Sequence, residues 1–239
     1  MKARTIVILI LAIILVDQLV KIWVKTNMPL SFNWDEYHAM LTKYDRGIRP
    51  FGAKADWCQI YFVENEGMAW GWKFGGDWGK MALTLFRLFA VIFGVFYIRS
   101  IIQKGYHKGF ILCVGLIFAG ALGNLIDSMF YGLIFDESTY TSVAKIFPAK
   151  GYAGFLHGKV VDMLYFPIIH TTYPSWVPVL GGRDFEFFSP VFNIADASIS
   201  AGVISILVFQ KKFFHKQNSQ DEHPVVETAT KVNDDVQVL

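Results

Sequence analysis

Four long apolar segments constrain this chain most, because each is long enough to cross a lipid bilayer. A helix needs about 20 mostly apolar residues to span the hydrocarbon core. The predicted spans cover residues 5–24, 81–98, 109–126 and 191–209. Of the 239 residues, 54% are hydrophobic and 18% charged, against about a quarter charged in a soluble domain. The sequence therefore predicts an integral membrane protein, and its net charge of +2 gives no sign of a nucleic-acid partner.

The first apolar segment also has the length expected for a secretory signal peptide. Lys2 and Arg4 precede it, as they would in such a peptide. However, Asp17, Gln18 and Lys21 follow the apolar run without a small-residue cleavage site. We interpret the segment as an uncleaved membrane anchor.

Basic residues flank the predicted spans on one side of the membrane. Two precede the first span, three separate the second from the third, and three follow the fourth. They are Lys2, Arg4, Arg99, Lys104, Lys108, Lys211, Lys212 and Lys216. By the positive-inside rule, both termini and the short middle loop are predicted to be cytoplasmic. The two long loops, residues 26–80 and 127–190, then face the outer side.

The two outer loops carry strand and interface patterns. Residues 58–63 are β-branched and aromatic, and residues 68–72 follow a glycine break, so we expect a small sheet in the first loop. In the second loop, residues 160–166 are apolar but too short to span, which predicts an interfacial or re-entrant segment. The predicted fold is mainly α, with one membrane domain over 1–216 and a polar, disordered cytoplasmic tail over 217–239.

Aspartates in or beside the apolar segments are the strongest functional signal. They are Asp17, Asp127, Asp162 and Asp196. A carboxylate at bilayer depth is costly and by default marks a functional site. All four are predicted to lie near the outer ends of the spans. Asp17 has Lys21 four residues later, so these two side chains could simply neutralise one another.

Asp162 and Asp196 are the best candidates for a reactive pair. Asp196 has no basic residue near it in the sequence, and Lys159 is the only cation close to Asp162. Two acids close together in a low dielectric share one proton, so that one pKa rises. The ionised acid can then draw a proton from water while the protonated one supports the attacked carbonyl. That chemistry is aspartyl peptide hydrolysis, and it needs neither a metal nor a cofactor.

Other functions remain open on the residues alone. A proton-coupled transporter or channel would use intramembrane aspartates as relays, but at several depths. A non-enzymatic assembly protein would use its asparagines for interhelical hydrogen bonds. A serine–lysine protease built on Ser128 has no lysine at an evident spacing. The sequence contains no His-Glu-x-x-His motif, no Gly-x-Ser-x-Gly motif and no phosphate-binding glycine loop.

Five motifs occur in one order along the chain. They are Asp17 to Lys21, Asn65-Glu66-Gly67-Met68-Ala69-Trp70-Gly71, Gly120-Ala121-Leu122-Gly123-Asn124-Leu125-Ile126-Asp127, Val160-Val161-Asp162-Met163 and Phe192-Asn193-Ile194-Ala195-Asp196. Together they resemble the lipoprotein signal peptidases of bacteria (signal peptidase II). The resemblance implies a four-span aspartyl protease of the inner membrane. Its substrate would be a diacylglyceryl-modified prolipoprotein, cut just before the lipidated cysteine.

The resemblance also implies roles for individual residues. The catalytic pair would be Asp162 and Asp196, with the site near the outer leaflet. The lining and supporting positions would be Asn65, Asn124, Asn193, Asp17, Lys21, Asp127 and Gly120. Expected partners are the prolipoprotein and membrane phospholipid, with no metal, cofactor or nucleic acid, and we expect a monomer.

The chain departs from the family pattern at Ser128, where the family usually has an arginine near the substrate lipid. Contact with the lipid headgroup would then come from elsewhere. Both outer loops are also longer than the family norm, with residues 133–158 and parts of 33–56 resembling insertions. The polar tail is a further addition.

Overall fold

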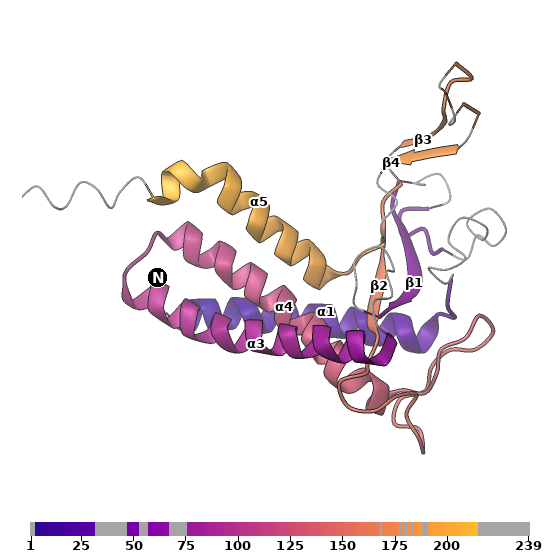
Figure 1. Ribbon diagram of the computed structural model, residues 1–239, viewed down its shortest axis with the longest axis horizontal. Coiled ribbons are helices and arrows are strands. Elements are labelled where there is room, and N and C mark those ends of the chain that lie inside the picture. Colours follow the sequence, from indigo (N-terminus) through magenta and orange to yellow (C-terminus); the bar gives the residue numbers. More distant parts are fainter. Residues whose placement is uncertain are drawn as a thin grey trace, which may run out of the picture.

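A computed structural model describes residues 3–31, 47–52, 57–66, 76–167, 169–176, 178, 181–182, 184–187 and 191–214. Four long helices lie side by side, and a two-stranded sheet lies across one end of the bundle (Figure 1). The helices are α1 (Ala3–Asn27), α3 (Gly76–Gln103), α4 (Lys108–Ile134) and α5 (Ile194–Phe214). Each is long and apolar enough to cross a membrane, so the four predicted spans are confirmed.

Helix α4 extends well past its predicted end at residue 126 and finishes at Ile134. The predicted span ends at residue 126, and the predicted outer loop begins at Asp127. In the structure Asp127 is fully buried and forms an ion pair with Lys21 of α1. Its charge is therefore compensated by another helix, and the apolar residues that follow continue the same helix.

Helix α4 is also the central helix, since it contacts α1, α3 and α5. Small residues allow the closest approach, which is the usual way for membrane helices to pack. A Cβ atom on Gly120 would lie 2.2 Å from the carbonyl oxygen of Ala195, and one on Gly202 would lie 2.7 Å from that of Cys113. Glycine at these positions lets α4 and α5 meet backbone to backbone.

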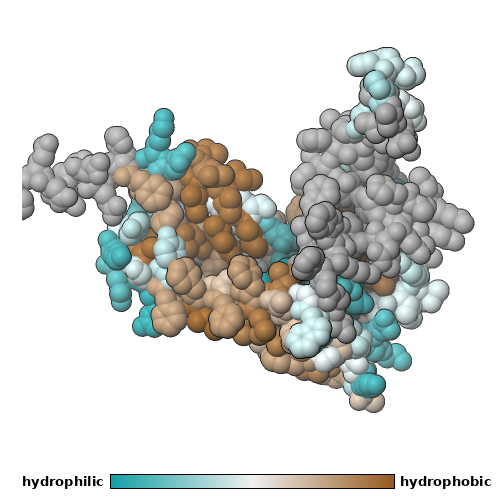
Figure 2. Space-filling model, in the orientation of Figure 1, coloured by the Kyte–Doolittle hydropathy of each residue, from teal (hydrophilic) through white to brown (hydrophobic). Residues whose placement is uncertain are grey.

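The surface of the bundle is strongly apolar. Large side chains on α1, α3 and α5 are exposed, including Leu11, Phe89 and Leu207. Figure 2 shows this apolar surface as a brown band along the helices, with hydrophilic residues at its two ends. Such a band is what a lipid bilayer would cover. Trp57 and Trp78 are exposed near the sheet end, as expected for an aromatic belt.

The sheet joins the two long loops instead of lying within the first. Strand β1 (Gln59–Asn65) pairs antiparallel with β2 (Val160–Tyr165), with Val63 opposite Asp162. The segment predicted to be interfacial or re-entrant is thus a strand, and β1 satisfies much of its backbone. A bridge between Leu164 and Phe192 ties β2 to the start of α5. The second predicted strand, residues 68–72, and the tail 217–239 lie outside the described residues.

The predicted insertion over 133–158 begins in the last turn of α4 and continues as a loop. A bridge between Phe135 and Ile146 closes its first part. Its last part packs on α4, where the N–H of Gly158 donates to the carbonyl of Ser128 at 2.9 Å. Farther along, β3 (Ile169–Thr172) and β4 (Asp184–Phe187) form a hairpin that extends away from the bundle (Figure 1).

Candidate active site

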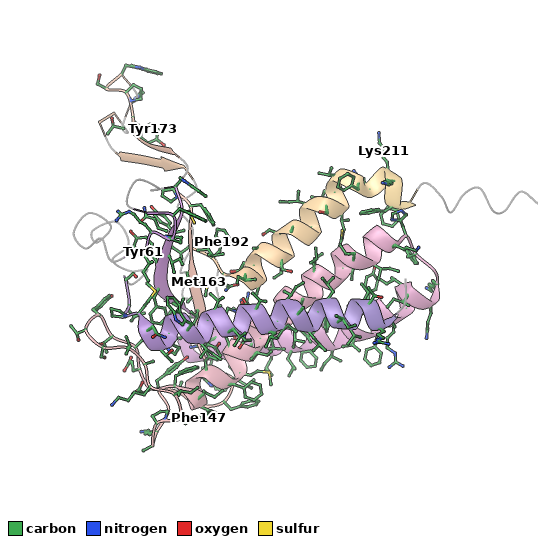
Figure 3. The ribbon with its side chains drawn as sticks, turned by 180° about the vertical axis from the view of Figure 1, so that it is seen from behind. Tyr61, Phe147, Met163, Tyr173, Phe192 and Lys211 are labelled. Atoms are coloured by element: carbon green, nitrogen blue, oxygen red, sulfur yellow. The ribbon has the colours of Figure 1, made fainter. Side chains whose placement is uncertain are left out.

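Asp162 and Asp196 lie where the sheet meets the bundle. The nearby side chains Met163 and Phe192 mark this junction in Figure 3. Asp162 is almost fully buried on β2, and Asp196 is half-buried in the first turn of α5. Asn193 contacts both carboxyls: its side-chain amide donates to Asp162 Oδ1 at 2.7 Å, and its backbone N–H donates to Asp196 Oδ2 at 3.3 Å. The two acids are therefore within reach of one residue.

The start of α5 orients Asp196. The backbone N–H of Asp196 donates to Asn193 Oδ1 at 2.9 Å, while Asp196 Oδ2 accepts from the backbone N–H of Asn193. This reciprocal pair is a capping box with aspartate in the third helical position. The helix N-terminus also favours a negative charge at that place. The local sequence Asn193-Ile194-Ala195-Asp196 thus begins the helix and fixes the carboxyl at once.

Two further asparagines hold the pair. Asn65 of β1 donates to Asp162 Oδ2 at 3.1 Å, and Asn124 of α4 donates to Asp196 Oδ1 at 2.7 Å. The Asn124 oxygen accepts in turn from Asn193 Nδ2 at 3.1 Å. The three asparagines singled out in the sequence therefore surround the carboxyls, each from a different part of the chain.

Lys21 supports this arrangement from α1. Its ammonium is fully buried and lies 2.9 Å from Asp17 Oδ2 and 2.7 Å from Asp127 Oδ2. It also donates to Asn124 Oδ1 at 2.9 Å. An ammonium has three hydrogens, so these three acceptors use all of them. The simple pairing of Asp17 with Lys21 is thus present, but it is one part of a larger network.

Asp17 and Gly120 fix α5 against the other helices. Asp17 Oδ1 accepts from the backbone N–H of Ala195 at 2.9 Å, which satisfies a donor in the first turn of α5. Gly120 makes no polar contact with the acids. Its contribution is steric, because any side chain there would push Ala195 away.

Two residues of the network were not singled out in the sequence. Gln18 donates to Asp127 Oδ1 at 2.8 Å, and the Tyr131 hydroxyl donates to Gln18 Oε1 at 3.1 Å. Gln18 could have been found as a polar residue in a membrane span beside Asp17. Tyr131 gave no such signal, because it lies in a part of α4 that was assigned to a loop.

Burial and a neighbouring charge raise the pKa of Asp162 to about 8. Burial of the carboxyl is the larger cause, and the negative charge of Asp196 adds to it. Hydrogen bonds from Asn65 and Asn193 act in the opposite direction but do not outweigh these two. Near neutral pH, Asp162 therefore holds a proton beside the second carboxyl.

Arg87 of α3 faces helix α4. Its Nη1 donates to the Ser128 hydroxyl oxygen at 3.2 Å. That hydroxyl donates to the carbonyl oxygen of Asn124 at 3.0 Å. The structure thus places an arginine of α3 beside the position where the family pattern has an arginine on α4. In the described part of the chain, the Ser128 hydroxyl pairs with Arg87 and Asn124 and with no lysine, which removes support for a serine–lysine pair.

A second buried cluster lies beside the first. Glu64 contacts Lys25 and Ser138, and its second oxygen lies 3.2 Å from Lys159 Nζ. Lys25 is fully buried and faces three aromatic rings, the nearest being Tyr152 at 5.0 Å from the ring centroid. We call Lys25, Glu64, Ser138 and Lys159 the outer cluster. It joins α1, β1 and the long second loop.

The arrangement can support acid–base chemistry on a bound peptide. It offers two carboxyls in contact with a common residue, one of them holding a proton, in a mostly buried setting. Within the part of the chain that the structure describes, no group of three or more His, Cys, Asp or Glu side chains is arranged to hold a metal ion.

Comparison with known proteins places the chain in a family. The family model of signal peptidase (SPase) II matches residues 9–212, which is most of the chain. The chain belongs to the signal peptidase II family. It is therefore a member of a family of membrane proteases that process lipoproteins.

Relatives and solved structures agree with this assignment. The lipoprotein signal peptidase of Porphyromonas gingivalis strain ATCC 33277 is 43% identical over 209 residues, covering 87% of this chain and 83% of that protein. The lipoprotein signal peptidase of Amoebophilus asiaticus is 31% identical over 200 residues, covering 83% of this chain and 74% of that protein. A solved structure described as a bacterial membrane enzyme has a TM-score of 0.53 at 21% identity, covering 92% of this chain and 94% of that one. This last likeness concerns the fold.

Proposed function

We propose that this member of the signal peptidase II family is an aspartyl endopeptidase with Asp162 and Asp196 as its catalytic pair. It removes the signal peptide from diacylglyceryl-modified prolipoproteins and cuts just before the lipidated cysteine. The observation that carries the proposal is Asn193, whose amide and backbone N–H contact one carboxyl each. A purely structural role would not call for two acids held together without a cation between them.

The proposed reaction uses one water molecule and no covalent intermediate. The ionised Asp196 accepts a proton from water, and the water oxygen forms a bond to the scissile carbonyl carbon. Asp162 donates its proton to the carbonyl oxygen, so a neutral diol results. The proton on Asp196 then passes to the amide nitrogen, Asp162 takes back a proton from one hydroxyl of the diol, and the carbon–nitrogen bond breaks. The products are a signal peptide with a new carboxyl terminus and a lipidated cysteine with a free amine.

The other network residues would hold this pair in place. Asn65 and Asn124 each donate to one carboxyl and fix its orientation. Lys21, with Asp17 and Asp127, would brace α1, α4 and the start of α5 around the site. These side chains touch the reacting acids or their holders and would not touch the scissile bond.

The membrane placement follows from charge and depth. We propose that both termini face the cytoplasm and that the acid pair lies near the outer leaflet of the inner membrane, because the basic residues gather at the opposite ends of the spans. A substrate held in the membrane by its signal helix and acyl chains would then reach the pair sideways between helices. We propose that the enzyme works as a monomer surrounded by phospholipid.

The test is cleavage of a synthetic diacylglyceryl-prolipoprotein by the purified chain in lipid nanodiscs. Wild type is compared with Asp162→Asn and Asp196→Asn, and with Glu137→Gln as a matched control on an exposed carboxylate. We expect wild type and the control to cut before the lipidated cysteine and the two asparagine variants to be inactive. Mass spectrometry of the products gives the cleavage position.

Two outcomes would contradict the proposal. If folded wild type does not cleave, a proton relay in a transporter becomes the better explanation of the buried acids. If Asp127→Asn proves as severe as the other two with the fold intact, the catalytic pair has to be reassigned.

A further inference from the structure

Arg87 is the one charged residue in the sequence between residues 81 and 98, the apolar centre of α3. A charged side chain at that depth is costly unless it has a specific partner. Its guanidinium is half-buried and donates to the Ser128 hydroxyl, on the side of α4 that carries Asn124. The side chain thus points into the bundle, toward the proposed active site.

A short polar path connects Arg87 to Asp196. Ser128 donates to the carbonyl of Asn124, and the Asn124 amide donates to Asp196 Oδ1 at 2.7 Å. The guanidinium also interacts electrostatically with three carboxyls, most strongly with Asp196 and then with Asp127 and Asp162. Arg87 is therefore close enough to bias the charge of the acid pair.

The charged side chains around Asp196 come from all the helices of the bundle and from strand β2. Four carboxyls and two cations meet there: Asp17 and Lys21 from α1, Arg87 from α3, Asp127 from α4, Asp162 from β2 and Asp196 itself from α5. The three hydrogens of Lys21 are directed at Asp17, Asp127 and Asn124. Of the three carboxyls within electrostatic range of Arg87, Asp196 interacts with it most strongly.

The surroundings of the two acids also favour a negative charge on Asp196 over one on Asp162. Asp196 lies at the N-terminus of α5, accepts from a backbone N–H there, and has Arg87 within electrostatic range. Asp162 accepts hydrogen bonds from the neutral amides of Asn65 and Asn193, has Lys21 within electrostatic range and is more deeply buried. A negative charge is better compensated on Asp196 than on Asp162.

We propose that Arg87 is a positioning residue that keeps the charge of the pair on Asp196 and the proton on Asp162. Asp196 is then the base that activates water, and Asp162 is the acid that supports the carbonyl. This inference rests on the proposed function and adds the residue that fixes the division of labour within the pair. Arg87 acts through Asp196 and does not contact the substrate.

The experiment measures kcat and KM across pH for cleavage of the synthetic prolipoprotein in nanodiscs. The variants are Arg87→Gln, Arg87→Lys and, as a matched control, Arg99→Gln at the exposed end of the same helix. Loss of the guanidinium makes ionisation of the pair harder, so for Arg87→Gln the acidic limb should move to higher pH by about one pH unit. We expect kcat at pH 6 to fall about tenfold with little change in KM, Arg87→Lys to restore most of it, and Arg99→Gln to match wild type.

Ser128→Ala keeps the charge of Arg87 but removes its anchor, so it should shift the acidic limb in the same direction by less. If the acidic limb of the pH dependence of kcat is unchanged in a folded Arg87→Gln protein, the proposal is overturned. A raised KM with an unchanged limb would also overturn it and would indicate that Arg87 binds an anionic lipid headgroup.

An infrared titration of the carboxyl groups separates this inference from the proposed function, because it does not require turnover. The carboxyl band assigned by its loss in Asp162→Asn should change its pH dependence in Arg87→Gln relative to wild type. An unchanged titration would refute the role of Arg87 even in an active enzyme. A shift in a protein that does not cleave would keep the role of Arg87 and reject the peptidase.

Discussion

Two buried acids on neighbouring positions of the same sheet behave in opposite ways. Glu64 lies opposite Val161 on the ladder, and Asp162 lies opposite Val63, one step farther along. Burial acts on both and by itself raises the pKa of each. For Glu64, the charges of Lys25 and Lys159 and the hydrogen bonds from Lys25 and Ser138 outweigh burial, so its pKa lies below the ordinary value. For Asp162, burial and the carboxylate of Asp196 together outweigh the charge of Lys21 and the hydrogen bonds from Asn65 and Asn193, so its pKa rises to about 8.

The comparison shows that the neighbours of a buried acid decide its role, while burial alone does not. The outer cluster has one carboxylate between two ammonium groups, so its charge is compensated and it ties three parts of the chain together. The acid pair has an excess of carboxyls, so one of them holds a proton at neutral pH. A buried acid whose charge is compensated holds parts of the fold together, and a buried acid whose charge is not compensated is available for proton transfer.

The largest expected effect comes from removing the acid of the pair. Asp162→Asn keeps the size of the side chain and both amide contacts within reach, but it cannot exchange a proton. We expect the rate of cleavage to fall by about 10³-fold or more. The thermal midpoint at pH 8 should stay equal or rise, because a buried carboxyl that is costly to ionise is replaced by a neutral amide. Activity and differential scanning fluorimetry on the same nanodisc sample measure both. If Asp162→Asn loses activity only because it unfolds, the assignment of Asp162 to proton transfer is contradicted.

The matching change in the outer cluster should have the opposite outcome. Glu64→Gln leaves Lys25 and Lys159 buried or half-buried without their counter-charge, which is expected to cost about 3 kcal/mol of stability. The acid pair keeps all its own contacts, so kcat at a temperature where the variant is folded should change less than about tenfold. Denaturant unfolding and initial rates give the two numbers. An inactive but fully stable Glu64→Gln would show that the outer cluster also takes part in chemistry.

The contact between α4 and α5 offers an intermediate test. Gly120→Ala places a Cβ about 2.2 Å from the backbone oxygen of Ala195, so the helices must separate. Overpacking of this kind typically costs about 1–3 kcal/mol, and here it also displaces the first turn that carries Asp196. We expect reduced stability and reduced kcat together. Gly154→Ala is the matched control, since nothing lies near that position.

The smallest effects are in the pH dependence, where the two acids differ in sign. The folded pKa of Glu64 is depressed, so its contribution to stability is present above the ordinary value of 4.5 and is lost as the pH falls through the folded pKa. The folded pKa of Asp162 is raised from 3.8 to about 8, so stability decreases as the pH rises between these values. Glu64→Gln should therefore flatten the stability curve below about pH 4.5, and Asp162→Asn should flatten it between pH 3.8 and about 8.

The same value for Asp162 predicts a limit on activity. If its proton supports the carbonyl, kcat/KM should fall as the pH rises through about 8. Because the two acids titrate together, this limb belongs to the pair. A basic limb that stayed in place when Asp162 was replaced by glutamate, in a variant that remained active, would contradict the assignment.

Much of the candidate site was predictable because its residues have an unusual chemical setting in the sequence. An aspartate in an apolar segment stands out without any structure, and so do asparagines at the ends of spans. What failed was the extent of α4: the sequence suggested that Asp127 ends a helix, while the structure buries it against Lys21. The sheet was also expected within one loop, and its second strand comes from the other. Both differences depend on partners that are distant in the chain.

The sequence by itself determined the four spans and the types of residue at the site, because hydropathy, length and residue chemistry are local properties. Only the tertiary structure decided which acid is compensated. Lys25 and Lys159 reach Glu64 from α1 and the second loop, and Asp196 reaches Asp162 across the junction of α5 and β2. The charge of a buried carboxyl depends on the groups within a few ångströms of it, and here most of those groups come from distant parts of the chain.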